Sequence, residues 1–366
     1  MAEWPLGDDP SGWPTVSVVM PVRNEAENLR TAVEAVLAQD YPRAFDVCLA
    51  VAPSHDETAD LARELADAFE QVMVVDNTAG TTPAGLNVAV QSTRGEVVVR
   101  VDGHAKLSDG YFRRAVETML RTGAVNVGGI QRAAGQAPFE EAVAAAMTSW
   151  LGTGGARFHV GGEPGPVDTV YLGVFRRDAL EAVGLFDERL IRNQDYELNI
   201  RLRKAGGAIW FDRSLSVEYR PRGSLRALAS QYHGYGWWKA EVARIHPRSL
   251  KLRQVMPVLL TGGIFGAVAL PLTRIGRYLT KRGMHRFGRF ITIGRLFPAV
   301  YLTTVMMISV GNYARSVGIN RSPTGLGGFS LQRTIGVLLA VPTMHLCWGF
   351  GFLSSCLRSA RTRRER

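Results

Sequence analysis

Short apolar, β-branched runs that alternate with helical patterns dominate the first third of this 366-residue chain. Runs of strand length are followed by amphipathic helical patterns at four places (15–22, 45–52, 71–77 and 95–104). Strands that alternate with helices predict right-handed βαβ units, and therefore a mostly parallel sheet with helices on both faces. Ligands of such sheets bind beyond the carboxyl ends of the strands. The polar residues that follow each predicted strand are therefore candidate site residues.

Two of these strand ends carry a notable set of polar residues. "PVRNE" ends the first strand at residues 21–25, and "VDGH" ends the fourth at residues 101–104. Asp102 and His104 form either a turn that ends a strand or part of a metal site. Carboxylate oxygen suits Mg²⁺ or Mn²⁺, and imidazole shifts the preference toward Mn²⁺ or softer ions. Taken alone, the strand end does not decide between the two interpretations.

The last third of the chain contains long uncharged runs that are bounded by arginines. They cover residues 254–273, 296–314 and 334–357, with 20, 19 and 24 residues. A helix needs about 20 apolar residues to cross a bilayer core, so two or three transmembrane or re-entrant helices are expected over 254–357. The alternative is a buried helical subdomain of a soluble protein.

Charge is distributed very unevenly along the chain. Residues 246–366 hold 18 Lys and Arg but one acid, for a net charge of +17, whereas residues 1–245 carry a net charge of −7. The positive charge interrupts apolar runs instead of forming a basic folded face, so a nucleic-acid partner is not expected. By the positive-inside rule, the basic connector 274–289 and the tail 358–366 are both expected on the cytoplasmic side. Three crossings would conflict with this, so one run would then be re-entrant.

An amphipathic helix is predicted just before the uncharged runs, at residues 224–245. Its Tyr235, Trp237 and Trp238 suit the interface between membrane and water. The three cysteines (Cys48, Cys347 and Cys356) are too few for a disulfide framework and fit a reducing environment that faces the cytoplasm.

Several motifs together resemble an inverting family 2 glycosyltransferase with a GT-A fold. They are "VSVVMPVRNEAENL", "VDGHA" and "NQDYELNIRLRKAGG", in that order and before a hydrophobic tail. With "YRPRGSL" and "HLCWGFGFL", the chain most resembles the membrane-bound, succinoglycan-type (ExoA-like) branch. The division expected is an N-terminal extension, a GT-A domain, an interface helix, a membrane domain and a basic tail (1–14, 15–223, 224–253, 254–357 and 358–366).

The resemblance implies roles for particular residues. Asp102 and His104 occupy the family's D-x-D position and would bind a divalent cation, Mn²⁺ or Mg²⁺. Asp195 matches the family's catalytic base, at a helix start that favours an ionised carboxylate and equally suits an N-cap. Gln194 would at most position the acceptor or the backbone. The residues implied in binding the nucleotide-sugar donor are Pro21, Arg23, Glu25, Ser54, Asp56, Asn87, Arg100 and Asp102.

Departures from the family pattern limit what the resemblance implies about substrates. The Asp pair that usually contacts uracil is replaced by Val51 and Ala52. A UDP-sugar is favoured as donor, and a GDP-sugar stays open. The "QYHGYGWW" stretch lacks the Arg of the processive Q-x-x-R-W motif, which indicates transfer of a single sugar. In the same stretch His233 is either a further metal ligand or part of an aromatic interface belt, and Arg222 is a candidate for acceptor or phosphate contact.

The expected protein is a membrane-anchored inverting hexosyltransferase. It would move one hexose from a nucleotide sugar to a lipid-linked, polyprenyl-diphosphate-type saccharide in surface or exopolysaccharide or glycolipid synthesis. The expected location is the cytoplasmic (inner) membrane, multi-pass, with the catalytic domain facing the cytoplasm. Two alternatives remain: a polyprenyl-phosphate sugar synthase, and a non-catalytic nucleotide-sugar-binding scaffold of a polysaccharide assembly complex.

Overall fold

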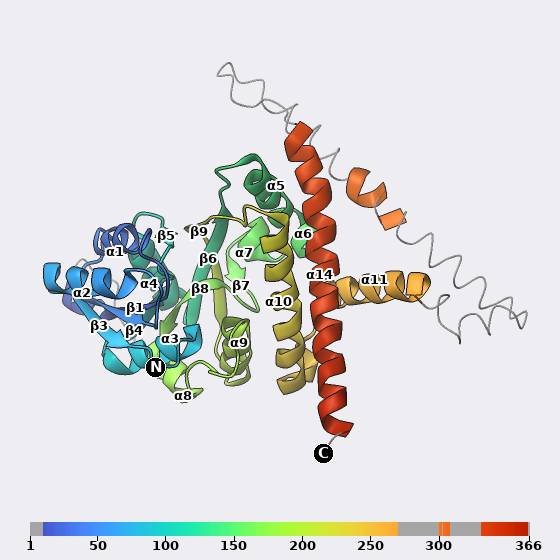
Figure 1. The fold of residues 1–366 in the computed structure, drawn as a ribbon. Helices are drawn as coiled ribbons and strands as arrows, with labels where there is room; N and C mark the ends of the chain where they lie inside the picture. The colour runs from blue at the N-terminus through green and yellow to red at the C-terminus, as the bar shows by residue number, and fades with distance from the viewer. Residues whose placement is uncertain (1–9, 270–299, 302, 308–330, 365–366) are drawn as a thin grey trace, which may run out of the picture. The chain divides into compact units, whose positions relative to one another are not determined.

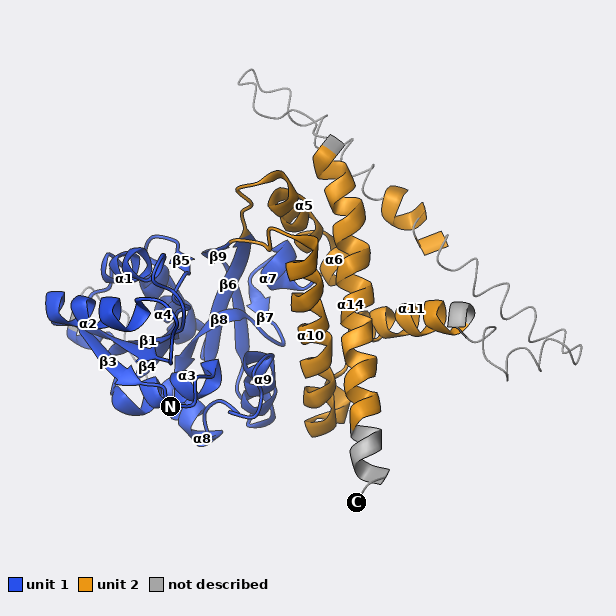
Figure 2. Cartoon of the chain, viewed as in Figure 1, with its two compact units in different colours: residues 1–132, 156–219 blue, residues 133–155, 220–366 orange. Residues whose placement is uncertain are grey.

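The computed structural model describes residues 10–269, 300–301, 303–307 and 331–364. The chain forms two compact units, residues 1–132 with 156–219 and residues 133–155 with 220–366 (Figure 2). The expected GT-A domain, 15–223, places residues 133–155 with the strands before them, whereas in the structure this segment groups with the C-terminal part of the chain.

A nine-stranded sheet lies at the centre of the first unit (Figure 1). The strand order is β3-β2-β1-β4-β8-β6-β9-β5, and β7 pairs with β9 at the side. The strands are β1 (Val16–Val22), β2 (Phe45–Val51), β3 (Val72–Asp76), β4 (Val97–Arg100), β5 (Lys106–Leu107), β6 (Asn126–Ala133), β7 (Gly165–Pro166), β8 (Tyr171–Arg176) and β9 (Ile209–Tyr219).

The predicted parallel strands form one half of this sheet. β1 pairs parallel with β2 and with β4, and β2 pairs parallel with β3. On the other side of β4, β8 joins antiparallel and β6 pairs antiparallel with β8. Val97, Val98 and Val99 of β4 are fully buried, which explains a continuous apolar run in place of alternation. The predicted α/β fold class is confirmed. The segment that forms β6 was not recognised as a strand.

Helices cover both faces of the sheet because successive strand residues point to opposite sides. Val18 belongs to a core with residues of α1, α2 and α4, whereas its neighbour Val19 belongs to a core with residues of α3, α8 and α9. The helices of this unit are α1 (Leu29–Leu37), α2 (Thr58–Ala68), α3 (Thr82–Ser92), α4 (Tyr111–Thr122), α7 (Arg157–Val160), α8 (Arg177–Ala182) and α9 (Gln194–Lys204), with a short 3-10 helix at Pro10–Gly12.

The second unit is helical where it is described. Its helices are α5 (Pro138–Met147), α6 (Trp150–Thr153), α10 (Leu225–Ile245), α11 (Leu252–Ala269) and α14 (Leu331–Arg364), with a 3-10 helix at Pro247–Ser249. The backbones of α10 and α14 approach very closely: a Cβ on Gly236 would overlap the carbonyl of Trp348, and one on Gly351 would overlap that of His233. Small residues at a helix crossing allow this close packing.

One helix among the described residues, Gln332–Arg358, is long and apolar enough to cross a membrane by length and composition. It contains the expected run 334–357. The run 254–273 is described only as far as Ala269, within α11, and 296–314 only at residues 300–301 and 303–307. The basic connector 274–289 lies outside the described residues.

Candidate functional site

Asn24 joins the loops that follow β1 and β2 through one hydrogen bond that it donates and one that it accepts. This residue has φ 54°, in the left-handed region that Asn tolerates better than most residues. Its backbone N–H donates to Ser54 Oγ (3.1 Å), and its Oδ1 accepts from the backbone N–H of His55 (2.9 Å). Because β1 and β2 are parallel neighbours, two motifs that are 30 residues apart in sequence meet at one edge of the sheet.

Other predicted donor residues lie at the same edge. Asp56 accepts hydrogen bonds from the backbone N–H of Ala26 (3.1 Å) and from the Thr58 hydroxyl, and the Thr58 bond holds the pKa of Asp56 below its usual range. Arg23 donates to the carbonyl of Gly80 (3.2 Å), which joins the loop after β3 to the other two. Pro21 is half-buried near the end of strand β1. These contacts assemble a cradle, defined here as the loops at residues 21–26, 54–58 and 77–81.

A buried arginine connects the two predicted key carboxylates. Arg100 ends β4 and is 8% exposed, and its Nε and Nη2 donate to Asp102 Oδ1 at 3.2 and 3.0 Å. Burial by itself would lower the pKa of Arg100, but the negative charges of Asp102 and Asp195 outweigh burial and raise it. The negative charges of Asp102, predicted at the end of strand β4, and of Asp195, predicted at the start of a helix 93 residues later, therefore both favour the charged form of Arg100.

A tyrosine that the sequence did not indicate lies beside this ion pair. Burial and the charge of Asp102 both raise the pKa of Tyr171, which begins β8. The side chain of Gln131, from β6, acts in the opposite direction and lowers the pKa of Tyr171. These residues meet only because β8 and β6 continue the sheet beyond β4, and a single sequence carries no signal of that pairing.

Asp195 lies at the start of α9, as predicted. The N-cap position is occupied by Asn193, at φ 60°, and Asp195 lies in the first turn. Its Oδ1 accepts a hydrogen bond from the backbone N–H of Tyr196 (2.8 Å). A carboxylate in the first turn interacts favourably with the positive end of the helix dipole.

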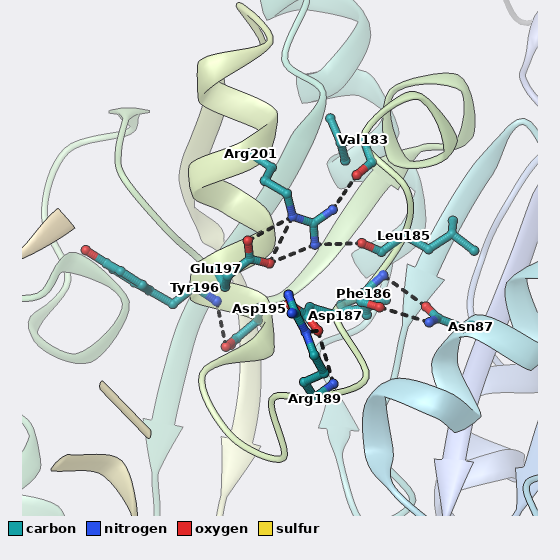
Figure 3. Close-up of polar contacts among 10 residues, drawn as sticks. All are labelled: Asn87, Val183, Leu185, Phe186, Asp187, Arg189, Asp195, Tyr196, Glu197 and Arg201. Carbon is teal, nitrogen blue, oxygen red and sulfur yellow. Dashed lines mark hydrogen bonds and ion pairs between the residues drawn. The ribbon is translucent and has the colours of Figure 1, made fainter. Parts of the chain in front are cut away.

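The loop that leads to Asp195 is held by a buried ion pair on α9 (Figure 3). Glu197 is 1% exposed and receives Nε and Nη2 of Arg201 at 2.9 and 2.8 Å. The same guanidinium donates to the carbonyls of Val183 and Leu185. The only sequence signal of this arrangement is the i, i+4 spacing of Glu197 and Arg201.

Asn87 fastens the same loop from α3 (Figure 3). Its Nδ2 donates to the Phe186 carbonyl (2.9 Å) and to Glu188 Oε1 (2.8 Å), and its Oδ1 accepts from the Phe186 N–H (2.9 Å). Both ends of the amide are therefore bonded within the protein. Asn87 positions the segment that precedes Asp195, a role that its place in the predicted donor set did not anticipate.

His104 lies against Glu25 instead of pairing directly with Asp102 in a closed cluster. Its Nδ1 is 2.7 Å from Glu25 Oε1. Within the described part of the chain, no group of three His, Cys, Asp or Glu residues could hold a metal ion. Mg²⁺ at phosphate sites commonly takes one or two carboxylates and completes its shell with phosphate and water. The oxygens of Asp102 and the imidazole of His104 fit a cation shared with a diphosphate, and they do not form a closed protein cage.

His233 and Arg222 belong to the second unit. The imidazole of His233 lies among aromatic rings, with ring centroids 6.2 Å from Trp237 and 5.9 Å from Phe350. Such neighbours are expected if His233 is part of an aromatic belt.

Known proteins resemble the chain in sequence and in fold. The pattern of Glycosyl transferase family 2 matches residues 17–184. Succinoglycan biosynthesis protein ExoA of Rhizobium meliloti (strain 1021) is 34% identical over 253 residues, which cover 69% of this chain and 77% of that protein. A dolichyl N-acetyl-alpha-D-glucosaminyl phosphate 3-beta-D-2,3-diacetamido-2,3-dideoxy-beta-D-glucuronosyltransferase of Methanococcus voltae is 25% identical over 238 residues, 63% of this chain and 74% of that protein.

Among solved structures, the mannosyltransferase PcManGT of Pyrobaculum calidifontis, in complex with GDP-Man and Mn²⁺, shares the fold. The TM-score is 0.57 at 16% identity, over 97% of this chain and 90% of that one. The sequence relatives and the shared fold both indicate a glycosyltransferase, and the cradle and the Arg100–Asp102 ion pair lie where such a sheet binds ligands, at the carboxyl ends of its parallel strands. The chain belongs to glycosyl transferase family 2 and is a glycosyltransferase of polysaccharide or glycolipid biosynthesis.

Proposed function

We propose that this enzyme transfers a single hexose, with inversion, from a nucleotide sugar to a lipid-linked saccharide. The relatives support this substrate class: one is named for succinoglycan biosynthesis, and the other is named for a dolichyl N-acetyl-glucosaminyl phosphate substrate. The observation that carries the proposal is the buried Arg100, which is hydrogen-bonded to Asp102 and interacts electrostatically with Asp195. This supports a single site in the first unit in which Asp102 lies on the phosphate side of the donor and Asp195 accepts the proton.

The chemistry assigns a separate task to each carboxylate. Asp195 accepts the proton of the acceptor hydroxyl as that oxygen attacks C1 of the sugar. Asp102 and His104 would hold a divalent cation, Mn²⁺ or Mg²⁺, which neutralises the charge of the departing diphosphate when it is bound. Arg100 keeps the Asp102 carboxylate in one orientation, because its two N–H groups converge on a single oxygen.

The cradle is the proposed nucleotide site. Arg23, Ser54 and Asp56 lie on loops that are already hydrogen-bonded to one another, so little ordering is required when the donor binds. Both a UDP-sugar and a GDP-sugar are compatible with this proposal. PcManGT, which shares the fold, was crystallised with GDP-Man.

A membrane location completes the proposal. α14 supplies one candidate span, Gln332–Arg358, and α10, with its aromatic residues, would lie at the cytoplasmic interface. The lipid-linked acceptor would then be confined to the same surface as the catalytic unit, which would face the cytoplasm. Further crossings within 254–357 remain part of the proposal.

The decisive experiment is a panel of UDP- and GDP-hexoses on membrane fractions, with Mn²⁺ or a chelator. Asp195→Asn is expected to lower turnover by about 10²- to 10⁴-fold, because general base catalysis contributes about that much. Asp102→Ala and chelation are both expected to abolish most of the transfer. Asp109→Asn, at an exposed carboxylate seven residues after Asp102, is the matched control and should leave the rate unchanged.

Other outcomes identify the alternatives. If Asp195→Asn retains most turnover, the acceptor is a lipid phosphate, which needs little help from a base. Donor binding without transfer or hydrolysis under any metal would indicate a scaffold. Transfer that is indifferent to both the chelator and Asp102→Ala would rule out the cation site.

A further inference from the structure

Glu25 and His104 form a contact that links the two most distinctive motifs of the first unit. Glu25 follows β1 and His104 follows β4, and these strands are parallel neighbours, so their carboxyl ends meet. His104 Nδ1 and Glu25 Oε1 are 2.7 Å apart, a short hydrogen bond between residues that lie 79 positions apart in sequence. The imidazole is about half exposed, whereas the Glu25 side chain is 17% exposed.

Glu25 is held rigidly on its own side of this contact. Its backbone N–H donates to Thr58 Oγ1 (2.8 Å), and its carbonyl accepts from the N–H groups of Asn28 and Leu29 (2.9 and 2.8 Å) at the start of α1. The aliphatic part of the side chain packs over Gly103, where an added Cβ would lie 3.0 Å from Glu25 Cγ. The glycine of the D-G-H motif therefore leaves room for Glu25, and a larger residue there would require the side chains of Glu25 and Val22 to shift slightly.

A carboxylate at one ring nitrogen determines the chemistry of the other. When Nδ1–H donates to a carboxylate, the neutral ring carries its lone pair on Nε2 and that nitrogen becomes more basic. Histidines that bind metal ions commonly have this carboxylate partner. We propose that Glu25 is a positioning residue that fixes His104 in the tautomer whose Nε2 binds the divalent cation together with Asp102. This inference rests on the proposed function, and it replaces direct donor contact as the main role of Glu25.

Mn²⁺ binding to the purified full-length chain tests the inference without requiring sugar transfer. Electron paramagnetic resonance measures free Mn²⁺ in the presence of UDP and, separately, of GDP. Glu25→Ala is expected to weaken Mn²⁺ binding about 10-fold, the lower end of the usual effect of losing an outer carboxylate, and His104→Ala, which removes the ligand itself, should weaken it at least as much. Glu25→Gln should retain most of the affinity, because the amide oxygen still accepts from Nδ1–H. Glu27→Ala, at an exposed carboxylate two residues away, is the matched control and should bind like wild type.

The double variant Glu25→Ala/His104→Ala separates this role from a general structural one. If Glu25 acts through His104, the double variant binds Mn²⁺ no more weakly than His104→Ala alone. Independent, additive losses would mean that Glu25 contacts the donor or supports the loop by another route, and would overturn the inference.

Imidazole ¹⁵N chemical shifts give a direct signature of the tautomer, with the His104 signals identified by their loss in His104→Ala. The wild type should show a protonated Nδ1 and an unprotonated Nε2, and Glu25→Ala should show a mixture of tautomers. An unprotonated Nδ1, or an imidazolium protonated at both nitrogens in the wild type, would overturn the inference.

The outcomes distinguish failure of the inference from failure of the proposed function. If His104→Ala weakens Mn²⁺ binding and Glu25→Ala does not, the cation site stands and the role of Glu25 is wrong. If His104→Ala binds Mn²⁺ like wild type while Asp102→Ala does not, both His104 and Glu25 are removed from the cation site. If the wild type binds no Mn²⁺ with either nucleotide, the cation site and this inference fail together.

Discussion

Arg100 is the residue whose burial most affects the proposed site. An arginine that is 8% exposed requires compensating negative charge, and Asp102 supplies it through two hydrogen bonds to one oxygen. The side chain of Asp102 is 22% exposed, so one side of this ion pair remains open to solvent. Arg100 therefore supplies a fixed positive charge next to Asp102, the carboxylate that is proposed to bind the divalent cation.

Replacing Arg100 tests whether it acts on the protein or on the donor. Arg100→Met should lower the free energy of unfolding by about 2–3 kcal/mol, somewhat less than for a fully buried pair because Asp102 is partly exposed. Arg100→Lys should lower the free energy of unfolding by a smaller amount, because an ammonium keeps the positive charge even though it cannot donate hydrogen bonds in a planar fork. Urea unfolding measures both. Arg63→Met is the control, because the exposed Arg63–Asp60 pair should contribute less than about 1 kcal/mol. Unchanged stability in Arg100→Met, with transfer lost, would assign Arg100 to donor binding alone.

At the scale of elements, α4 and β9 are joined by a buried aspartate. Asp212 of β9 accepts from the Thr118 hydroxyl of α4 (2.6 Å) and from the backbone N–H and hydroxyl of Ser214 (2.9 and 2.8 Å). Burial would raise the pKa of Asp212, but these hydrogen bonds outweigh burial and hold the pKa below its usual value. The folded state therefore favours the ionised carboxylate more than the unfolded chain does.

The stability of this junction should depend on pH. With an unfolded pKa of about 3.9, the contribution of Asp212 is fully present above about pH 5 and is lost as the pH falls through the lower folded pKa. Asp212→Asn should be about 1–2 kcal/mol less stable at pH 7, and its free energy of unfolding should fall less between pH 5 and pH 3 than that of wild type. Asp67→Asn, at an exposed position, should follow the wild-type curve. Parallel curves for wild type and Asp212→Asn would contradict the prediction.

The crossing of α10 and α14 depends on glycine. A Cβ on Gly351 would overlap the carbonyl oxygen of His233, which is backbone and cannot move aside without separating the helices. Gly351→Ala should therefore lower the thermal unfolding temperature of the detergent-solubilised chain, even though alanine is the better helix former by about 1 kcal/mol. Gly262→Ala in α11 is the matched control, because nothing lies within 4 Å of the added Cβ, and it should be neutral or stabilising. Equal effects of the two substitutions would disprove the close contact.

At the scale of the whole molecule, the chain passes between its two units at residues 132, 155 and 219. The first unit supplies the cradle and both carboxylates, and the second contains the candidate membrane span. Because residues 133–155 belong to the second unit, a cut at residue 223 would not separate two independent folding units.

Substitutions at two depths of α14 test membrane insertion. Leu339 and Leu357 are both exposed and apolar, but Leu357 adjoins Arg358 at the end of the candidate span. Leu339→Glu, seven residues inside the candidate span, should shift the chain out of the carbonate-resistant membrane fraction, since a charge within the apolar segment costs up to about 2.5–3.5 kcal/mol on insertion. Leu357→Glu should remain in that fraction, because a charge near the interface costs far less. If both variants stay in the membrane fraction, α14 does not span as proposed.

The predicted parallel half of the sheet and Asp102 at a strand end followed from local patterns, whereas Asp195 was singled out by the family resemblance. The run Val97–Val99 and the first turn of α9 carry their own signals, because strand burial and helix starts depend on nearby residues. β6 was not recognised, because "NVGGIQRA" contains glycines that are required by contact with distant strands: a Cβ on Gly129 would overlap the carbonyl of Leu215. The role of Asn87 in holding the loop before Asp195 could not be predicted either, since its partners lie about 100 residues away in sequence.

By itself, the sequence determined the alternation of strands and helices, the uncharged runs and the residues that end each parallel strand, because these depend on side chains a few positions apart. Tertiary structure alone decided which of those residues meet. It placed Glu25 against His104, because adjacent parallel strands bring distant loops to one edge, and it brought Asp195 into electrostatic reach of the buried Arg100. Burial there gives hydrogen bonds and charges a strength that their spacing along the chain does not reveal.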